Sequence, residues 1–279
     1  MKTSNIAIVT DSTADLPDHL TSALNIHVVP NLIIINGKSL VDGKDISRQD
    51  YYKRLPEMDP LPTTATASSG AYKQIYERLL QSGFNQVLSI HASKLLSGIF
   101  NAASVAAQSF GERIHVLDSE QASLGLGFQV LGAAEAALRG TSLDNILELA
   151  GDIRRRIRLV ALLDTLEYIR RSGRVSWARA RIGQILKIKP LVELKSGKVL
   201  SMGEARTFHK GLIRLLDILR SLGPLEQLGI LHTNAEVAAH QLLNGLAPEL
   251  PAEPLLINVT TVIGTHVGPG GLGFVAVVK

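Results

Sequence analysis

The sequence predicts an α/β fold with two domains: an N-terminal, mostly parallel sheet flanked by helices, and a C-terminal α/β domain with a mixed sheet. In the first half, short apolar runs alternate with helical patterns, which is typical of parallel strands covered by helices. After about residue 160 a hairpin pattern interrupts this alternation. With 279 residues, of which 46% are hydrophobic, the chain suits one large or two medium domains. We expect the domains to span residues 1–158 and 159–279.

The expected strands of the first half are apolar runs that are short enough to cross a sheet once. They cover residues 5–10, 27–35, 86–90, 114–117 and 159–163. Between them, the spacing of the apolar residues predicts helices over 70–81, 98–110, 124–139 and 142–158. Asn36-Gly37 lies between apolar residues and predicts a tight turn, because both residue types tolerate positive φ.

The second half combines helices with a predicted hairpin. Two alternating strands within residues 190–201 surround Ser196-Gly197, which predicts the turn between them. Helical patterns cover 165–171, 177–187, 207–222 and 235–246, and strands are expected over 227–232 and 255–263. A hairpin among such helices indicates a mixed sheet.

Composition restricts the classes of function. The chain has no cysteine, which excludes disulfides, thiolate catalysis and zinc sites built from Cys. No apolar run approaches the roughly 20 residues that span a bilayer, and the N-terminus lacks a signal-peptide pattern. We therefore expect a cytoplasmic protein without integral membrane association.

Residues 151–200 form a basic block, with 13 Lys and Arg against 4 Asp and Glu. Such a block indicates an acidic partner, an anionic ligand or nucleic acid, and its competing interpretation is a solvated helical face. Neither interleaved aromatic residues nor a nucleic-acid reader motif accompanies the block. The sequence therefore predicts no nucleic-acid partner.

Hydroxyl-rich loops follow several expected strands, and the run 63–70 precedes an expected helix. In open parallel sheets, ligands bind beyond the carboxyl ends of the strands, and the N–H groups of helix N-termini hold anions there. Thr64 and Ser97 are the strongest individual candidates for an anion site. The competing interpretation of any single hydroxyl is a helix N-cap.

Residues 264–273 contain six glycines or prolines, with His266 among them, and are expected to form a loop. Gly268-x-Gly270-x-x-Gly273 matches the dinucleotide fingerprint in letters only, because that fingerprint needs a helix after it. A short β-type run, 274–279, follows instead. His266 is either a general base or a hydrogen-bonding partner of a ligand. The sequence lacks the motifs of serine hydrolases, phosphate loops and zinc hydrolases, and no metal is expected.

The order of these motifs resembles the DegV family of bacterial fatty-acid-binding proteins. The similarity extends over essentially the whole length. It rests on an opening segment, a central segment, an Asp-Thr-Leu-Glu-Tyr segment followed by Ile188-Lys189-Pro190, and the C-terminal glycine-rich segment. The four segments are residues 8–17, 116–127, 163–175 and 263–270. Their occurrence in this order is far more specific than any one of them alone.

The resemblance implies that one long-chain fatty acid, such as palmitate, binds between two α/β domains. Its acyl chain would lie in an apolar tunnel, with hydroxyl groups holding the carboxylate. The resemblance maps a carboxylate ligand to Thr64 and leaves Ser93 and Ser97 as alternatives for a second hydroxyl. It also matches Arg206 to the family arginine after the hairpin and His266 to the family histidine, whereas Lys94 replaces a family serine.

The leading hypothesis is thus a monomeric lipid carrier that needs no cofactor besides its fatty acid ligand. Some members of the family present the carboxyl group to a fatty acid kinase, and a kinase partner would then dock on Arg170, Arg171 and Arg174. The alternative hypothesis is an enzyme that acts on a small anionic substrate with His266 as its base.

Overall fold

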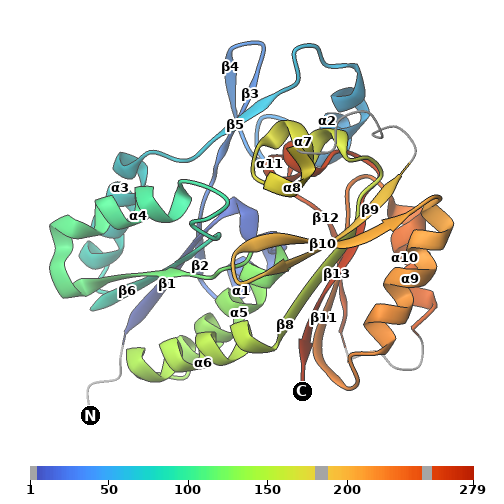
Figure 1. Ribbon diagram of the computed structural model, residues 1–279. Coiled ribbons are helices and arrows are strands. Elements are labelled where there is room, and N and C mark those ends of the chain that lie inside the picture. Colours follow the sequence, from blue (N-terminus) through green and yellow to red (C-terminus); the bar gives the residue numbers. More distant parts are fainter. Residues whose placement is uncertain (1–4, 180–187, 247–252) are drawn as a thin grey trace. The chain divides into compact units, whose positions relative to one another are not determined.

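The computed structural model describes residues 5–179, 188–246 and 253–279, which are drawn in colour in Figure 1. The chain divides into two compact units. Unit 1 consists of Met1–Leu32 and Ala65–Arg155, and unit 2 consists of Ile33–Thr64 and Arg156–Lys279.

These units differ from the two continuous domains that we expected. The later boundary, after Arg155, lies close to the expected one, but residues 33–64 belong to unit 2. The reason is an apolar cluster in which Tyr51 and Tyr52 pack with Tyr168 and Val262. Contacts between residues more than 100 positions apart therefore assign this segment, and no local pattern reveals them.

Unit 1 contains a four-stranded parallel sheet in the order β2-β1-β6-β7. The strands are β1 (Ile6–Asp11), β2 (Ile26–Val29), β6 (Gln86–His91) and β7 (Ile114–Asp118). The helices of the unit are α1 (Asp18–Ala23), α3 (Ser69–Gln81), α4 (Ile99–Ala107), α5 (Leu124–Leu138) and α6 (Leu143–Arg156), with 3-10 turns at Ser12–Ala14 and Gln108–Arg113.

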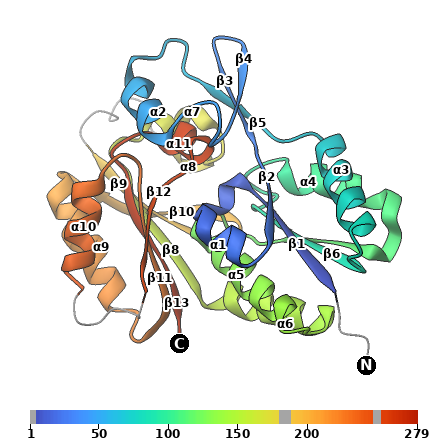
Figure 2. The same ribbon diagram turned by 180° about the vertical axis from the view of Figure 1, so that it is seen from behind.

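Helices cover both faces of this sheet. Figures 1 and 2 show α3 and α4 on one side, with α1 and α5 on the other. Every residue of β1 is buried, which explains its uninterrupted apolar run. The carboxyl ends of β1 and β6, at Asp11 and His91, open into the polar loops of the unit.

Unit 2 contains a six-stranded mixed sheet in the order β10-β9-β8-β13-β11-β12. Its strands are β8 (Ile157–Leu162), β9 (Lys189–Lys195), β10 (Lys198–Ala205), β11 (Leu225–His232), β12 (Leu255–Asn258) and β13 (Leu272–Val278). Helices α9 (Phe208–Arg220) and α10 (Glu236–Asn244) lie side by side on it (Figure 1). Their apolar side chains, including Leu215 and Leu242, form one core with Phe274 and Val160 of the sheet.

Unit 2 also contains several short helices and a small sheet. The helices are α2 (Arg48–Arg54), a 3-10 turn at Leu55–Glu57, α7 (Glu167–Ser172), α8 (Ser176–Arg179) and α11 (Thr261–Val267). A small sheet in the order β4-β3-β5 joins β3 (Leu32–Ile35), β4 (Lys38–Val41) and β5 (Thr63–Ala65). None of the helices in the described ranges combines the length and the apolar composition that crossing a bilayer requires.

The structure confirms both turns that the sequence predicts. Asn36 and Gly37 join β3 to β4, and Ser196 and Gly197 join β9 to β10, all with positive φ. Residues 274–278 belong to β13 and not to a helix, which confirms that the glycine-rich segment is no dinucleotide fingerprint. Of the helix expected over 177–187, the structure describes α8 up to Arg179, and the rest lies outside the described residues.

Two expected strands are wrong in part. The strand predicted over 27–35 is two strands, β2 and β3, which belong to different sheets. The strand predicted over 255–263 ends at Asn258, and residues 261–267 form helix α11 instead of a strand end and a loop. Tyr52 donates to carbonyl oxygens just before this helix, and Asp42 accepts from the hydroxyl groups of Thr260 and Thr261. These tertiary hydrogen bonds outweigh the β-branched composition of the segment. His266 therefore lies in the last turn of a helix, and the loop begins only at Gly268.

Candidate functional site

The structure brings two of the predicted site residues of unit 2 together. Thr64, in the middle of β5, and His266, at the end of α11, are 202 positions apart, yet Thr64 Oγ1 lies 2.9 Å from His266 Nε2. This distance is that of a hydrogen bond. When Nε2–H donates to Thr64 Oγ1, the threonine O–H can donate in turn to an anion.

Helix α11 is fixed by buried polar contacts with residues 33–64. The Asp42 carboxylate accepts hydrogen bonds from the hydroxyl groups of Thr260 and Thr261, at the start of the helix. Near its end, Tyr51 Oη and Thr265 Oγ1 are 2.5 Å apart. The residue next to His266 is therefore held from outside the helix, which limits the positions that the imidazole can take.

Close packing against aromatic rings explains two glycines in this region. A Cβ atom at Gly264 would lie 2.1 Å from Tyr52 Oη, and one at Gly268 would lie 2.3 Å from Tyr168 Cδ2. Gly268 also has a φ of +79°, which disfavours any other residue. Tyr52 Oη donates to the carbonyl oxygen of Val259 at 2.9 Å, so the ring has little freedom to move. The glycines thus let the backbone approach these rings.

His266 is neutral at pH 7. Burial, together with the positive charge of Arg174, lowers its pKa from 6.5 to about 4. A general base works best when its pKa lies near the operating pH. This histidine therefore suits hydrogen bonding better than proton abstraction at neutral pH.

The two candidate serines of unit 1 lie on the loop that follows β6. Ser93 is fully buried, and its Oγ accepts a hydrogen bond from Leu95 N at 3.2 Å. Ser97 is partly exposed, and its Oγ accepts from Ile99 N at 3.4 Å, just before α4. Accepting this bond leaves the O–H proton of Ser97 available to donate.

Lys94, which replaces a family serine, contacts Asp118 and Phe100 of unit 1. Its Nζ lies 3.8 Å from Asp118 Oδ2 and 5.8 Å from the centre of the Phe100 ring. With 60% of its side chain exposed, this ion pair contributes little to stability.

The four arginines that the sequence singled out occupy different environments. Arg206 follows β10 and is exposed, and within the described residues no hydrogen bond joins it to Thr64 or His266. Arg171 pairs with Glu167 at 2.7 Å, whereas the Nε atom of Arg170 is buried without a hydrogen-bonding partner among the described residues. Arg174 donates from Nη1 to Ser172 O at 2.6 Å and acts on His266 through its charge.

Unit 1 also contains a buried polar chain that the sequence did not reveal. His91 Nδ1 lies 3.0 Å from Asp11 Oδ2, and His91 Nε2 lies 2.7 Å from Ser89 Oγ, which in turn accepts from Tyr76 Oη at 2.8 Å. Asp11 and His91 stand at the ends of adjacent parallel strands, and this placement is the one sequence signal that could have paired them.

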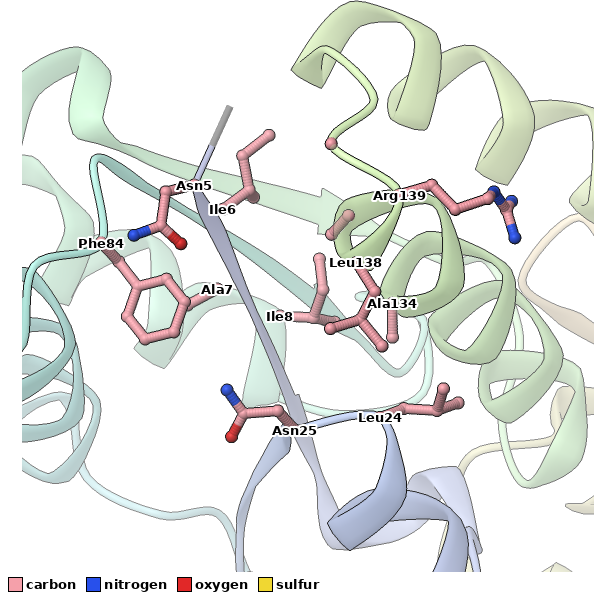
Figure 3. Close-up of a pocket in the computed structure, with 12 residues that line it drawn as sticks. Asn5, Ile6, Ala7, Ile8, Leu24, Asn25, Phe84, Ala134, Leu138 and Arg139 are labelled. Carbon is pink, nitrogen blue, oxygen red and sulfur yellow. The ribbon is translucent and has the colours of Figure 1, made fainter. Parts of the chain in front are cut away.

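A pocket of about 380 Å³ lies elsewhere in unit 1 (Figure 3). It is lined by the start of β1, including Ile6 and Ile8, and by the end of α5, including Ala134 and Leu138. Figure 3 shows that Arg139 directs its guanidinium group away from Ile8. Because the pocket is at the amino end of β1, it is remote from the hydroxyl loops at the carboxyl end. We assign no ligand to it.

The described part of the chain contains no group of three or more His, Asp or Glu side chains placed to hold a metal ion. The candidate residues instead carry hydroxyl groups, a neutral imidazole and, near that imidazole, the charge of Arg174. Such groups bind a carboxylate or another small anion through hydrogen bonds.

The chain is similar to known proteins along almost its whole length. A family model described as an uncharacterised protein of the DegV family matches residues 5–279. A DegV domain-containing protein of Listeria monocytogenes is 34% identical over 279 residues, covering 98% of this chain and 99% of the relative. A DegV domain-containing protein of Streptomyces coelicolor is 34% identical over 275 residues, covering 97% and 98%.

Solved structures show the same fold. A DegV family protein from Thermus thermophilus, described as binding fatty acid, superposes with a TM-score of 0.91 at 34% identity, covering 99% of this chain and all of that one. DegV from Bacillus subtilis, described as a fatty acid binding protein, gives a TM-score of 0.86 at 30% identity, covering 99% of both chains. The chain belongs to the DegV family.

Proposed function

We propose that this protein binds a long-chain fatty acid and holds its carboxylate with hydroxyl groups. The single observation that carries the proposal is the pairing of Thr64 Oγ1 with His266 Nε2 at 2.9 Å, beside the charge of Arg174. The descriptions of the Thermus thermophilus and Bacillus subtilis relatives as fatty acid binding support it. Ser97, which is partly exposed, is the proposed hydroxyl ligand of unit 1, and the fully buried Ser93 is the alternative.

The proposed ligand needs no catalytic group. The serine loop is the segment 92–98 between β6 and α4, which carries Ser93 and Ser97. A carboxylate accepts hydrogen bonds from Thr64 and from this loop without changing its covalent state, and a histidine with a pKa of about 4 is a weak base at pH 7. Burying the acyl chain would contribute about 0.8 kcal/mol per CH₂, so the tail supplies most of the affinity. The protein would thus act as a carrier without turnover of its own.

The affinity for palmitate tests the carboxylate site, with Thr63→Ala as the matched control for Thr64→Ala. The two threonines are neighbours in β5, but Thr63 is exposed and Thr64 faces His266. A hydrogen bond to a charged group contributes about 1.5–3 kcal/mol, so Thr64→Ala should weaken binding roughly 10- to 150-fold. Thr63→Ala should bind like the wild-type protein. Equal affinity of the two variants would refute the assignment.

The affinity for fatty acids of increasing length tests the tail. Each added CH₂ should improve the dissociation constant about fourfold until the cavity is filled. Mass spectrometry of lipid released from the native protein by organic solvent would identify the natural ligand. A protein that releases no fatty acid and takes up none does not have this function.

We further propose that the bound carboxyl group is presented to a fatty acid kinase. The family resemblance and the basic residues 170–174 support this partner. Purified kinase should phosphorylate fatty acid that is bound to this protein, and the protein alone should not consume ATP. Consumption of ATP by the protein alone would favour the enzyme hypothesis instead.

A further inference from the structure

Asp11 is a fully buried carboxylate at the carboxyl end of β1. Among the described residues it accepts hydrogen bonds from five donors. Oδ1 accepts from Thr13 N at 3.0 Å, from the Thr13 hydroxyl and from Asn31 Nδ2 at 3.2 Å. Oδ2 accepts from His91 Nδ1 at 3.0 Å and from Ala92 N at 3.3 Å.

These donors belong to three segments that are distant in sequence. Thr13 is in the 3-10 turn after β1, Asn31 follows β2, and His91 with Ala92 ends β6 and begins the serine loop. Asn31 extends the connection, because its Oδ1 accepts from Ala67 N at 3.4 Å. One side chain thus ties together the loops at the carboxyl edge of the unit 1 sheet.

The charge of Asp11 strengthens these links. Burial raises its pKa, but the hydrogen bond and the charge of His91, with the hydrogen bonds from Thr13, outweigh burial and leave the pKa below its usual value. The carboxylate is therefore ionised at neutral pH. Hydrogen bonds to a charged acceptor are about twice as strong as those between neutral groups.

Ser89, His91 and Asp11 are hydrogen-bonded in the sequence of a catalytic Ser-His-Asp triad, but they do not lie at an open site. Ser89, His91 and Asp11 are each 0% exposed, so no substrate reaches the serine. Ser89 also accepts a hydrogen bond from Tyr76, which lies behind it in the core. Its bond to Ser89 links His91 to Tyr76 in the core, whereas its bond to Asp11 links it to the loops.

The serine loop starts at this anchor. Ala92 N donates to Asp11, and the next amide, Ser93 N, donates to Gln121 O at 2.9 Å. Farther along, Ser97 N donates to Ser93 O at 3.2 Å. The backbone positions of Ser93 and Ser97 therefore follow from where Asp11 holds Ala92.

We propose that Asp11 is a positioning residue for carboxylate recognition: through His91 and Ala92 it sets the place of the loop that carries Ser93 and Ser97. This inference rests on the proposed function, in which a serine of this loop holds the carboxylate. Asp11 itself would not touch the ligand. Its contribution is to remove the freedom of the hydroxyl groups before the ligand arrives.

Asp11→Asn is the test variant, and Ser89→Ala is its matched control. The Nδ2 atom of Asn donates hydrogen bonds and cannot accept them. In either orientation of the amide, Nδ2 therefore replaces one carboxylate oxygen and meets donors: those of Thr13 and Asn31, or those of His91 and Ala92. Ser89→Ala breaks the same chain on its core side and leaves every link to the loops. Both variants should lower the melting temperature, because both disturb buried hydrogen bonds.

The discriminating measurement is the ratio of the affinities for palmitate and for methyl palmitate, which lacks the charged carboxylate. We expect Asp11→Asn to lower this ratio about tenfold or more, and Ser89→Ala to keep the wild-type ratio. Hydrogen–deuterium exchange without ligand should be faster at residues 92–97 in Asp11→Asn only. A folded Asp11→Asn protein with the wild-type ratio and exchange would overturn the inference.

The design separates the two proposals. A wild-type protein that does not prefer the acid over the ester refutes the proposed carboxylate site, whatever Asp11 does. If Asp11→Asn does not fold, Thr13→Val serves instead, because it keeps the shape of the side chain and four of the five donors. It should lower the affinity ratio about two- to fivefold, and an unchanged ratio would count against Asp11 as a positioning residue.

Discussion

Replacing Gly264 by Ala is the most direct test of how the structure places His266. Gly264 lies in α11, two residues before His266, and an added Cβ atom would be 2.1 Å from Tyr52 Oη and 2.5 Å from two ring carbons. Ordinary contacts between such atoms are about 3.5–4.0 Å. Either the Tyr52 ring or helix α11 must therefore move by more than 1 Å or so.

The expected cost follows from what holds Tyr52 in place. Overpacking of this kind costs about 1–3 kcal/mol. Moving the ring also breaks the hydrogen bond from Tyr52 Oη to Val259 O, and an unpaired buried hydroxyl costs about 1–3 kcal/mol. The better helix propensity of Ala offsets up to about 1 kcal/mol. We expect the free energy of unfolding to fall by about 2–4 kcal/mol.

Thermal unfolding measures this loss, with Gly151→Ala as the control for the exchange itself. A Cβ atom at Gly151, within α6, would meet only Arg155 Nη1 at an ordinary 3.7 Å, so Ala should raise stability slightly there. At about 2–4 °C per kcal/mol, Gly264→Ala should lower the melting temperature by roughly 5–15 °C. Its affinity for palmitate should fall as well, because His266 moves with the helix.

A Gly264→Ala protein that is as stable as the wild type would refute this steric account. Such a result would mean that the Tyr52 ring is not held where its hydrogen bond places it. Normal stability with reduced fatty acid affinity would equally contradict the steric argument, since the clash must be relieved at a cost in packing.

Four further outcomes are expected. Because the pKa of His266 is lowered from 6.5 to about 4 in the folded protein, the unfolded chain binds the proton at higher pH. The stability of unit 2 should therefore fall as the pH drops from about 6.5 toward 4. Urea unfolding at several pH values should show that His266→Gln loses less stability than the wild type over this range. Arg174→Ala should raise the pKa of His266 in an NMR titration, because it removes a nearby positive charge; an unchanged value would place Arg174 too far away to act. Tyr51→Phe should cost about 1 kcal/mol of unfolding free energy through the lost bond to Thr265, and a neutral result would show that this bond adds nothing. Arg171→Glu should leave palmitate binding intact and slow phosphorylation by a kinase partner, and an unchanged rate would argue against docking at this arginine.

Local sequence patterns predicted most elements of the fold. The strand expected over 86–90 and the helix over 124–139 correspond to β6 and α5 within a residue or two at each end. Both turns predicted from Asn36-Gly37 and Ser196-Gly197 are present, since their positive φ angles depend on the residues themselves. Periodicity and turn chemistry act over a few residues, so they can be read before folding.

The candidate site was predicted only in part. The resemblance placed Thr64 and His266 in one site, and the structure puts them in hydrogen-bonding contact. Asp11 and His91 directly follow the expected strands 5–10 and 86–90, but neither segment by itself shows that the two side chains share a buried hydrogen bond. Arg174 was assigned to a partner surface, yet its charge acts on His266.

By itself, the sequence determined the fold class and most of the strands and helices, because these depend on local periodicity and on residue types. Tertiary structure alone decided that residues 33–64 belong with the C-terminal unit, that residues 261–267 are helical, and that the imidazole of His266 is neutral. Each of these depends on contacts between residues that are far apart in the chain. The contacts are aromatic rings that pack against glycines and hydroxyl groups that bond to carbonyl oxygens, and burial of His266 disfavours its charged form.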